Sequence, residues 1–266
     1  MKKNQNPTED IKQDLDKGQH FLVDLTVVKK GVSIANISKK DKIIEIGAGN
    51  GNLTDELVKK AENVVAFEID KRYAEKLNIL EKNNKNLKVI YDNAFNYSWK
   101  DYTKIVSNIP YFISEQIINK AIKDEIPGMT LIVGEKFKEK LAKSQSKIGI
   151  ISNLFYNIEF IMKVDKKCFS PPPPRVNSWL IKLRKKEKFT NVESIIVSIL
   201  GRGGKLKNSI LYSLVEKGKT KRESRIIIKN MNFDESTLEK PVSRITGKLL
   251  IMLTKELEKL KNIGEI

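Results

Sequence analysis

Short apolar segments, each followed by a turn of distinctive composition, constrain the fold of this chain more than any other feature. Four of them occupy residues 42–46, 64–67, 87–91 and 105–107. Their length suits buried strands, and helical patterns lie between them. Strands that alternate with helices predict a doubly wound, mainly parallel sheet. Met129–Val133 continues the series, and the alternating segment Val176–Leu183 predicts an antiparallel strand that closes the sheet.

The first strand runs into a glycine-rich turn, Gly47-Ala48-Gly49-Asn50-Gly51, just before a helical pattern. Glycines at such a junction let the backbone approach a ligand closely, and a helix that starts there directs its free N–H groups at that ligand. A glycine-rich turn alone is a weak signal. It gains weight only if other polar side chains lie at the same edge of the sheet.

Acidic residues end the next two strands. Glu68-Ile69-Asp70 follows residues 64–67, about 20 residues after the first glycine, the spacing at which a carboxylate binds the hydroxyl groups of a ribose. Asp92-Asn93 follows residues 87–91, where an acid or an amide can reach the amino group of an adenine ring. The last two glycines of the turn are two residues apart, not three as in the dinucleotide pattern. The set therefore fits S-adenosylmethionine better than NAD.

The fourth strand ends in Asn108-Ile109-Pro110-Tyr111. The Asn108 amide oxygen and the Ile109 carbonyl can each accept one N–H bond of an exocyclic amine, while the flat ring that carries this amine stacks on Tyr111. Pro110 fixes φ and offers no competing donor. By itself Asn-x-Pro at a strand end is more often a simple turn.

In combination these motifs resemble those of the rRNA adenine dimethyltransferases, meaning bacterial KsgA and its archaeal and eukaryotic counterparts, with the Erm resistance methyltransferases as relatives. The resemblance runs from Gly18 to about Leu183, and more thinly to the C-terminus. It implies a class I methyltransferase fold, a Rossmann-like α/β architecture with a small C-terminal α-helical domain. It also includes the segment 19–24, Gln-His-Phe-Leu-Val-Asp.

The resemblance assigns roles to individual residues. The cofactor contacts that it implies are Gln19, His20, Leu22, Gly47, Gly49, Gly51, Glu68, Ile69, Asp92, Asn93 and Asn108. The catalytic residues that it implies are Asn108, Ile109, Pro110, Tyr111 and Phe169. Gln19 and Phe21 belong to the element that closes over the cofactor. The residues alone leave another interpretation of this segment open, a helix start with Asp24 as the N-cap.

Four prolines at 171–174 predict a stiff extended loop that presents Phe169. From the sequence alone Phe169 is either a core residue beneath this loop or a stacking partner for a base. The resemblance favours stacking, opposite Tyr111.

The chain divides into three predicted parts. Residues 1–17 are polar and form an N-terminal arm, residues 18–184 form the methyltransferase domain, and residues 185–266 form a small helical RNA-binding domain. In the family a basic stretch of this last domain contacts RNA. Here that stretch is Arg202-Gly203-Gly204-Lys205-Leu206-Lys207, in which two glycines replace part of the usual Arg/Lys run.

Composition narrows the class of protein. The formal charge is +17 over 266 residues, which favours a polyanionic partner, although lysine-rich chains can be basic without one. A single cysteine excludes an intrachain disulfide and indicates a reducing compartment, and with a single histidine it argues against a metal site. No apolar run reaches the roughly 18 residues of a membrane span, so a cytoplasmic, monomeric protein without a membrane partner is expected.

The predicted function is S-adenosylmethionine-dependent dimethylation of two adjacent adenines in the loop near the 3′ end of small-subunit rRNA. The partner is this rRNA or the immature small ribosomal subunit, and the reaction is coupled to ribosome biogenesis. Two alternatives stay open. One is an Erm-type methyltransferase of large-subunit rRNA, and the other is an assembly factor whose RNA binding matters more than its catalysis.

Overall fold

The computed structural model describes residues 20–143, 146–170 and 175–266. The predicted N-terminal arm and Gln19 lie outside these ranges. The chain forms two compact units: the first comprises residues 1–139 and 156–185, and the second comprises residues 140–155 and 186–266. The segment 140–155 thus groups with the C-terminal helices, whereas the domain boundary expected from the sequence at residue 185 assigned it to the methyltransferase domain.

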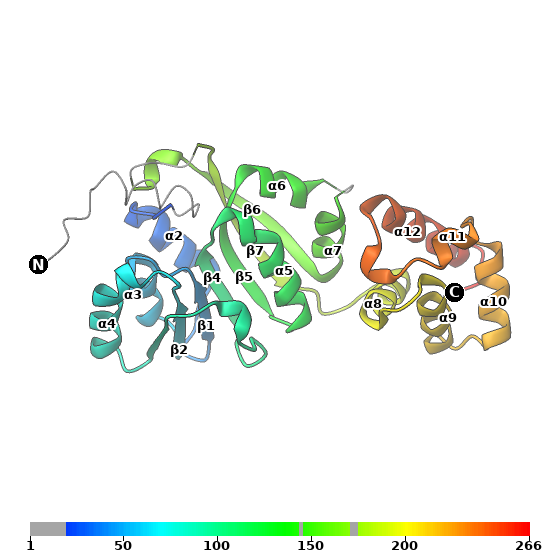
Figure 1. Ribbon diagram of the computed structural model, residues 1–266, viewed down its shortest axis with the longest axis horizontal. Helices are drawn as coiled ribbons and strands as arrows, with labels where there is room; N and C mark the ends of the chain where they lie inside the picture. Colours follow the sequence, from blue (N-terminus) through cyan, green and yellow to red (C-terminus); the bar gives the residue numbers. More distant parts are fainter. Residues whose placement is uncertain (1–19, 144–145, 171–174) are drawn as a thin grey trace, which may run out of the picture. The chain divides into compact units, whose positions relative to one another are not determined.

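The first unit is built on a seven-stranded sheet with the strand order β3-β2-β1-β4-β5-β7-β6 (Figure 1). Its strands are β1 (Lys42–Ile46), β2 (Asn63–Phe67), β3 (Leu87–Ile90), β4 (Lys104–Asn108), β5 (Gly128–Gly134), β6 (Tyr156–Val164) and β7 (Ser178–Lys185). The first five strands pair in parallel, and β7 runs antiparallel to both β5 and β6. This confirms the predicted doubly wound, mainly parallel sheet and its antiparallel closing strand.

Helices connect the parallel strands and cover the sheet. The α-helices of this part of the chain are α2 (Leu25–Ala35), α3 (Asn52–Val58), α4 (Ala74–Asn83), α5 (Ser114–Lys123) and α6 (Glu135–Ala142). The α2 helix begins where the sequence predicted, because the Asp24 carboxylate accepts hydrogen bonds from the N–H groups of Thr26 (2.8 Å) and Val27 (3.4 Å).

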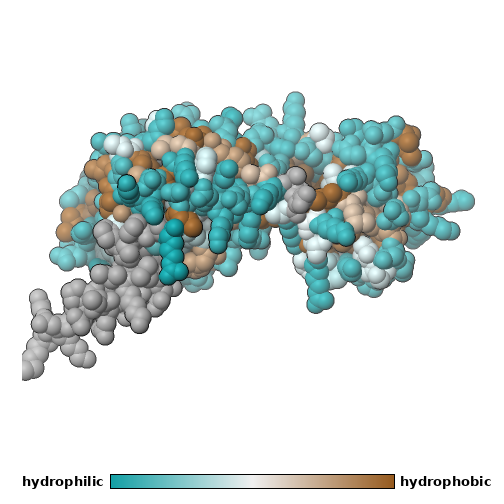
Figure 2. All heavy atoms as spheres, turned by 90° about the horizontal axis from the view of Figure 1, so that it is seen from above, coloured by the Kyte–Doolittle hydropathy of each residue, from teal (hydrophilic) through white to brown (hydrophobic). Residues whose placement is uncertain are grey.

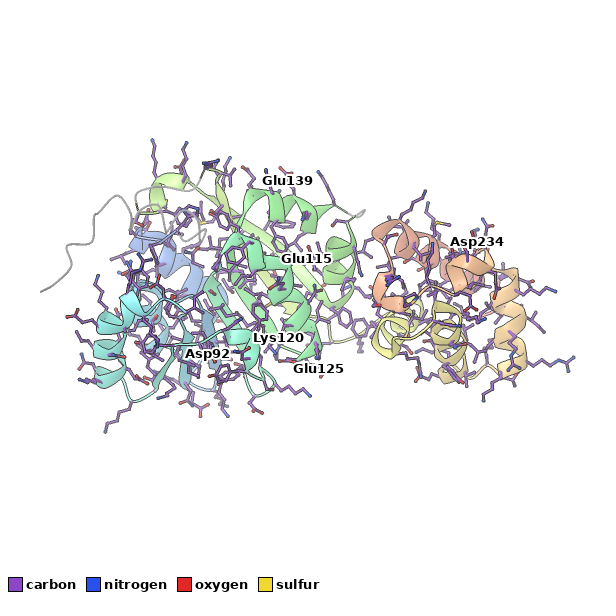
Figure 3. All side chains as sticks on the ribbon, in the orientation of Figure 1. Asp92, Glu115, Lys120, Glu125, Glu139 and Asp234 are labelled. Carbon is purple, nitrogen blue, oxygen red and sulfur yellow. The ribbon has the colours of Figure 1, made fainter. Side chains whose placement is uncertain are left out.

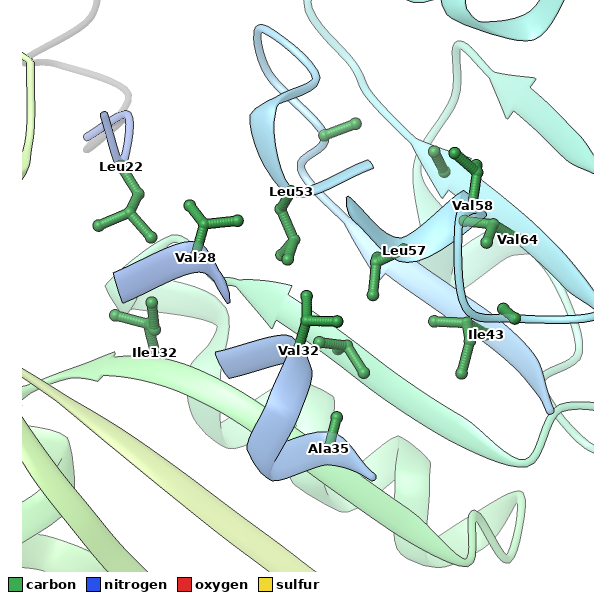
Figure 4. Close-up of a cluster of buried hydrophobic side chains, with 14 of the residues drawn as sticks. Leu22, Val28, Val32, Ala35, Ile43, Leu53, Leu57, Val58, Val64 and Ile132 are labelled. Carbon is green, nitrogen blue, oxygen red and sulfur yellow. The ribbon is translucent and has the colours of Figure 1, made fainter. Parts of the chain in front are cut away.

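One hydrophobic cluster of the first unit lies between the sheet and helices α2 and α3 (Figure 4). Val28 and Val32 of α2 lie beside Leu53 and Leu57 of α3, and Ile43 of β1 underlies them. Ile43 and Ile44 point to opposite faces of the sheet, yet both are fully buried. Both faces of β1 are therefore covered, which explains its continuous apolar sequence.

The second unit is helical, as expected for the C-terminal part of the chain. Its helices are α7 (Lys147–Phe155), α8 (Asn191–Arg202), α9 (Leu206–Glu216), α10 (Lys221–Asn230), α11 (Glu235–Leu238) and α12 (Gly247–Asn262). Capping boxes start α8 at Thr190 and α10 at Thr220. Most buried apolar side chains of this unit belong to one hydrophobic cluster, which includes Leu154 of α7 and Leu250 of α12.

Candidate active site

A cavity of about 390 Å³ opens where the parallel strands β1 to β4 end. The strand order reverses here, because β2 lies on one side of β1 and β4 on the other. Ligands of open α/β sheets bind at the carboxyl ends of the strands next to such a reversal. The cavity is lined by most of the residues predicted from the sequence, namely His20, Gly47, Glu68, Ile69, Asp92, Asn93, Asn108, Ile109, Pro110 and Tyr111.

The glycine turn connects β1 with this cavity. Gly47, Gly49 and Gly51 all have positive φ (77°, 53° and 82°), which other residues rarely adopt. Gly47 lines the cavity, whereas Gly49 lies against the ring of Phe21, and Gly51 lies against Leu80 of α4. The structure thus brings one of the three predicted glycine contacts to the cavity wall, since the other two make room for side chains that pack on the turn.

Glu68 links the glycine turn to the end of β2. Its carboxylate is buried and accepts the N–H of Gly49 at Oε2 and the N–H of Asp70 at Oε1, each at 2.8 Å. Burial raises the pKa of Glu68, and these two hydrogen bonds partly oppose that shift. A buried carboxylate in the cavity wall, with lone pairs beyond those two bonds, suits hydroxyl groups of a ligand.

Asp92 stands at the end of β3 (labelled in Figure 3). Its Oδ1 accepts hydrogen bonds from the Asn93 N–H (2.6 Å) and from Asn96 Nδ2 (3.2 Å), and these bonds lower the pKa of Asp92. Asn93 uses its own side-chain oxygen to accept the N–H of Phe95. The carboxylate of Asp92 is therefore ionised at neutral pH and held in place by the short turn that follows β3.

Asn108 occupies the end of β4 with its side-chain amide held on one side only. Its Nδ2 donates to the carbonyl oxygen of His20 at 2.9 Å. Its Oδ1 is buried and has no hydrogen-bond partner among the residues that the structure describes. Buried polar atoms are normally satisfied, so an unsatisfied acceptor in a cavity wall points to a donor on a ligand. Behind it, Ser107 Oγ donates to the Ile46 carbonyl at 2.5 Å and ties β4 to β1.

Tyr111 is held at both its ring and its hydroxyl group. A Cβ added to Gly134 would lie 3.0 Å from two atoms of the Tyr111 ring, closer than most Cβ contacts, so glycine at this position leaves room for the ring. The hydroxyl of Tyr111 shares a 2.5 Å hydrogen bond with the buried Ser178, and burial raises the pKa of Tyr111. The ring of His20 lies 5.7 Å away. The orientation of Tyr111 is therefore fixed by the fold.

Leu22 and Phe169, two further predicted site residues, are not brought into the cavity. They pair in an isolated antiparallel bridge, and both are buried in the hydrophobic cluster of the first unit, with 6% and 3% of their surface exposed. Apolar side chains lose contact with water here without any ligand, which is a sufficient reason for their burial. In this structure Phe169 is the core residue that the sequence left as one of two alternatives.

Several cavity residues were not predicted because their signal in the sequence is weak. Ile46 and Phe67 belong to apolar runs in which any residue is compatible with the core, and Phe95 lies in the short turn after β3. The neighbours of Tyr111 are more informative, since Phe112 and Gln116 also line the cavity and Phe112 is 67% exposed. The aromatic residue directly after the Asn-Ile-Pro-Tyr motif is the sequence feature from which Phe112 could have been predicted as a cavity residue. Phe21, expected in the closing element, lines the cavity as well.

Metal-binding clusters and membrane-spanning helices are both lacking in the described ranges of the chain. Within them, no group of three or more His, Cys, Asp or Glu side chains is arranged to hold a metal ion. No helix in that part of the chain has the length and apolarity needed to span a membrane.

Comparison with known proteins identifies the family of the chain. Residues 11–246 match the model of the ribosomal RNA adenine dimethylase family. A probable ribosomal RNA small subunit methyltransferase A from Pyrococcus abyssi is 32% identical over 188 residues, which cover 68% of this chain and 69% of the relative. The corresponding protein of Methanococcus vannielii is 34% identical over 191 residues, which cover 69% and 71%.

Solved structures agree at the level of the fold. A dimethyladenosine transferase from Plasmodium falciparum has a TM-score of 0.63 at 23% identity and covers 90% of this chain and 98% of its own. The 23S rRNA methyltransferase ErmE has a TM-score of 0.61 at 21% identity and covers 90% and 99%. These two structures confirm the predicted class I methyltransferase fold, while the family model and the relatives in sequence confirm the predicted family. The chain belongs to the ribosomal RNA adenine dimethylase family.

Proposed function

We propose that this protein transfers methyl groups from S-adenosylmethionine to the exocyclic amines of two adjacent adenines in the loop near the 3′ end of small-subunit rRNA, during subunit maturation. Family membership supports an rRNA adenine methyltransferase. The two relatives described above are named as ribosomal RNA small subunit methyltransferases. Their names favour small-subunit rRNA as the substrate over the large-subunit rRNA of an Erm-type enzyme.

The cavity residues fit S-adenosylmethionine. The volume of about 390 Å³ lies in the range of small-molecule sites, and the wall combines apolar and acidic groups. Glu68 would accept the ribose hydroxyl groups, Asp92 would accept the adenine amine, and Gly47 would border the methionine end. Ile69 and Phe95 provide apolar surface for the adenine ring. When bound, this cofactor supplies a methyl group that is activated by the charge of its sulfonium.

Asn108 would activate the exocyclic amine of adenine, which is a poor nucleophile. The amine of adenine is unreactive because its lone pair is delocalised into the ring. An acceptor that binds one N–H bond draws the nitrogen toward a tetrahedral shape and frees that lone pair. Asn108 Oδ1 is such an acceptor, and its bond from Nδ2 to the His20 carbonyl keeps the amide oriented. The Ile109 carbonyl is the proposed second acceptor.

Tyr111 would hold the target base. A base that leaves its stack loses a few kcal/mol, and stacking on an aromatic side chain restores about 1–3 kcal/mol. Gly134 and Ser178 hold the Tyr111 ring and its hydroxyl in place. Little side-chain conformational entropy is therefore lost when a base stacks on this ring. Alignment of amine and methyl donor then provides much of the acceleration.

The buried and unpartnered Oδ1 of Asn108 carries this proposal, so its removal is the sharpest test. Asn108→Ala is expected to lower kcat by about two orders of magnitude or more, because a contact made in the transition state is lost. The affinity for S-adenosylmethionine, measured by calorimetry, should change only a few-fold. Asn83→Ala, an exposed asparagine at the end of α4, is the matched control. Near wild-type turnover of Asn108→Ala would contradict the assigned role.

The identity of the substrate needs a separate measurement. Mass mapping of methylated adenines in rRNA from cells with and without the protein should show two dimethylated neighbours that disappear from small-subunit rRNA. Loss of a methylated adenine from large-subunit rRNA would instead indicate an Erm-type enzyme. If no adenine changes while subunit maturation fails, the protein acts as an assembly factor.

A further inference from the structure

The basic stretch that the family pattern assigns to RNA is largely neutralised within the second unit. Lys205 pairs with Glu239 at 2.7 Å, and Lys207 pairs with Glu239 and, at 3.4 Å, with Glu235. Lys205 and Lys207 lower the pKa of Glu239 to about 2, so the Glu239 carboxylate stays ionised at neutral pH. Arg202 is bound in the same way by Glu216. These cations already have anionic partners.

A different surface of the same unit carries cations without such partners. Arg222, Arg225 and Lys229 follow each other at spacings of three and four residues along α10, so they share one face of the helix. All three side chains are exposed, and within the described ranges none has an acidic partner at ion-pair distance.

The two cations at the start of α10 do not serve the helix itself, whereas Lys229 lies in the last turn, where a cation suits the helix dipole. Thr220 is the N-cap, so Lys221 and Arg222 occupy the first two helical positions. Cations in the first turn oppose the helix dipole, which favours negative charge there. The acid of this turn, Glu223, has its carboxylate bound by the N–H and the hydroxyl of Thr220. The helix therefore keeps positive charge where its own stability does not require it.

An exposed aromatic ring lies beside Lys221, the first residue of α10, and the Arg202 guanidinium lies 5.7 Å from the centre of the same ring. Tyr212 of α9 is 44% exposed, and the amine of Lys221 lies 5.9 Å from the centre of its ring. Ile226, 53% exposed, lies one residue beyond Arg225. Cations arranged around an exposed aromatic ring are typical of surfaces that bind nucleic acid through phosphates and stacking. Hydrophilic side chains also dominate the face of the molecule shown in Figure 2, as expected for a chain with a charge of +17.

We propose that the surface formed by Tyr212, Lys221, Arg222, Arg225 and Lys229 binds the phosphate backbone of the rRNA substrate. This inference rests on the proposed function and moves the RNA contact of the second unit from the stretch 202–207 to the exposed face of α10. This surface would bind RNA independently of its sequence. Phosphates would pair with the Arg and Lys side chains, and a base or a sugar would contact Tyr212.

The test uses the full-length protein and a transcript of the 3′ part of small-subunit rRNA. The variant Arg222→Gln, Arg225→Gln, Lys229→Gln removes three charges and keeps good helix formers. The matched control, Lys76→Gln, Lys82→Gln, Lys85→Gln, removes three charges from exposed lysines on and just after α4 in the first unit. Affinity is measured over a series of potassium chloride concentrations, and S-adenosylmethionine affinity is measured for every protein.

Each lost phosphate contact reduces the slope of log affinity against log salt by about 0.7–0.9. The α10 variant should therefore lose about 2 to 3 from the magnitude of this slope and at least about tenfold in RNA affinity at moderate salt. Its S-adenosylmethionine affinity should be unchanged, and KM for RNA should rise while kcat stays the same. The control should stay close to the wild type.

Two results with the α10 variant and its control would overturn the inference, and a third result concerns the stretch 202–207. One is an α10 variant with wild-type RNA affinity and salt slope, and the other is an equal loss in both variants, which would reflect net charge alone. A further variant, Lys205→Gln with Lys207→Gln, should affect RNA binding less than the α10 variant; a larger effect would return the contact to the stretch 202–207. If the wild-type protein neither binds nor methylates the transcript, the proposed function fails rather than the assignment of the surface.

Discussion

At the scale of single residues, Phe112 shows how the structure adds to the motif. The Asn-Ile-Pro-Tyr sequence ends at Tyr111, whose ring and hydroxyl are held by Gly134 and Ser178. The next residue is an aromatic side chain that lines the same cavity with two thirds of its surface exposed. Exposure of so large an apolar ring is unfavourable in water, and it suits a surface that RNA covers.

Phe112→Ala is therefore expected to raise KM for the RNA. Stacking of a base on an aromatic side chain is worth about 1–3 kcal/mol, which corresponds to about fivefold to 150-fold. S-adenosylmethionine affinity and kcat should be nearly unchanged, and Phe112→Tyr should restore the wild-type KM. Ile79→Ala, an exposed apolar residue on α4, is the control. If Phe112→Ala instead weakens cofactor binding and leaves KM for RNA unchanged, Phe112 faces the cofactor.

Glu45 provides a residue-scale prediction about pH. It lies in β1, is 1% exposed and accepts a hydrogen bond from the Thr54 hydroxyl at 2.6 Å. Burial raises the pKa of Glu45 to about 8, from an ordinary value of 4.5. The folded protein therefore retains a proton that the unfolded chain releases. The contribution of this proton to stability is complete below pH 4.5 and is lost as the pH rises to about 8.

Glu45→Gln removes this titration and can still accept the Thr54 hydroxyl. In urea unfolding, the wild type should lose on the order of a few kcal/mol of unfolding free energy from this group between pH 5 and pH 8.5, and the variant should not. Glu62→Gln, at an exposed site, should keep the wild-type dependence on pH. A Glu45→Gln variant with the same loss as the wild type would show that Glu45 is ionised in the folded protein.

At the scale of elements, the glycine turn after β1 is coupled to the segment 20–24 that borders the cavity. Phe21 packs on Gly49, its carbonyl accepts the N–H of Ser170 at 2.8 Å, and Asn52 Nδ2 donates to the Leu22 carbonyl at 3.1 Å. The glycine turn, the segment 20–24 and the chain near residue 170 thus hold one another in place. A substitution in the glycine turn should therefore alter the cavity, because Phe21 contacts both.

Gly49→Ala tests this coupling. Its Cβ would lie 2.7 Å and 2.8 Å from atoms of the Phe21 ring, and a φ of 53° disfavours alanine in addition. We expect S-adenosylmethionine affinity, measured by calorimetry, to fall about tenfold or more, which is about 1.4 kcal/mol. Gly201→Ala lies in α8 with nothing within 4 Å of its Cβ, and should leave binding unchanged and raise stability by about 0.4–1 kcal/mol. If both variants bind S-adenosylmethionine with equal affinity, Phe21 does not influence the cofactor site.

At the scale of the whole molecule, the chain crosses between its two units more than once. Residues 140–155 belong to the helical unit, and Leu154 of α7 is buried in the cluster formed with α8 and α12. A fragment that ends at Lys185 keeps the cavity residues but removes the partners of this helix. It should bind S-adenosylmethionine, yet expose apolar side chains of α7 to water.

We therefore expect the fragment 1–185 to bind a hydrophobic dye strongly and to aggregate at concentrations where the full-length protein does not. Replacing Ile150, Ile151 and Leu154 by Gln in the same fragment should reduce both effects, because these side chains lie in or against the buried cluster of the helical unit. Low dye binding by the unmodified fragment would mean that residues 140–155 fold without the C-terminal helices.

The sequence by itself determined the mainly parallel sheet and the residues at the ends of its strands, whereas the spatial order of the strands came from the structure. Apolar runs of three to five residues and the turns that follow them are local features, so β1 to β4 and the positions of Gly47, Glu68, Asp92 and Asn108 can be predicted without tertiary contacts. Only the tertiary structure decided which of two compatible roles a side chain takes. Phe169 and Leu22 are buried against each other, while Phe112 is exposed in the cavity wall.

Charge shows the same division between sequence and structure. The sequence determined that the C-terminal unit is basic, but it did not say which cations are paired, because an ion pair depends on the distance between residues far apart in the chain. Glu239 lies more than thirty residues from Lys205 and Lys207, and folding brings it within reach of both. Arg222, Arg225 and Lys229 have no such partner among the described residues, and this difference in pairing is decided by the packing of α9, α10 and α11.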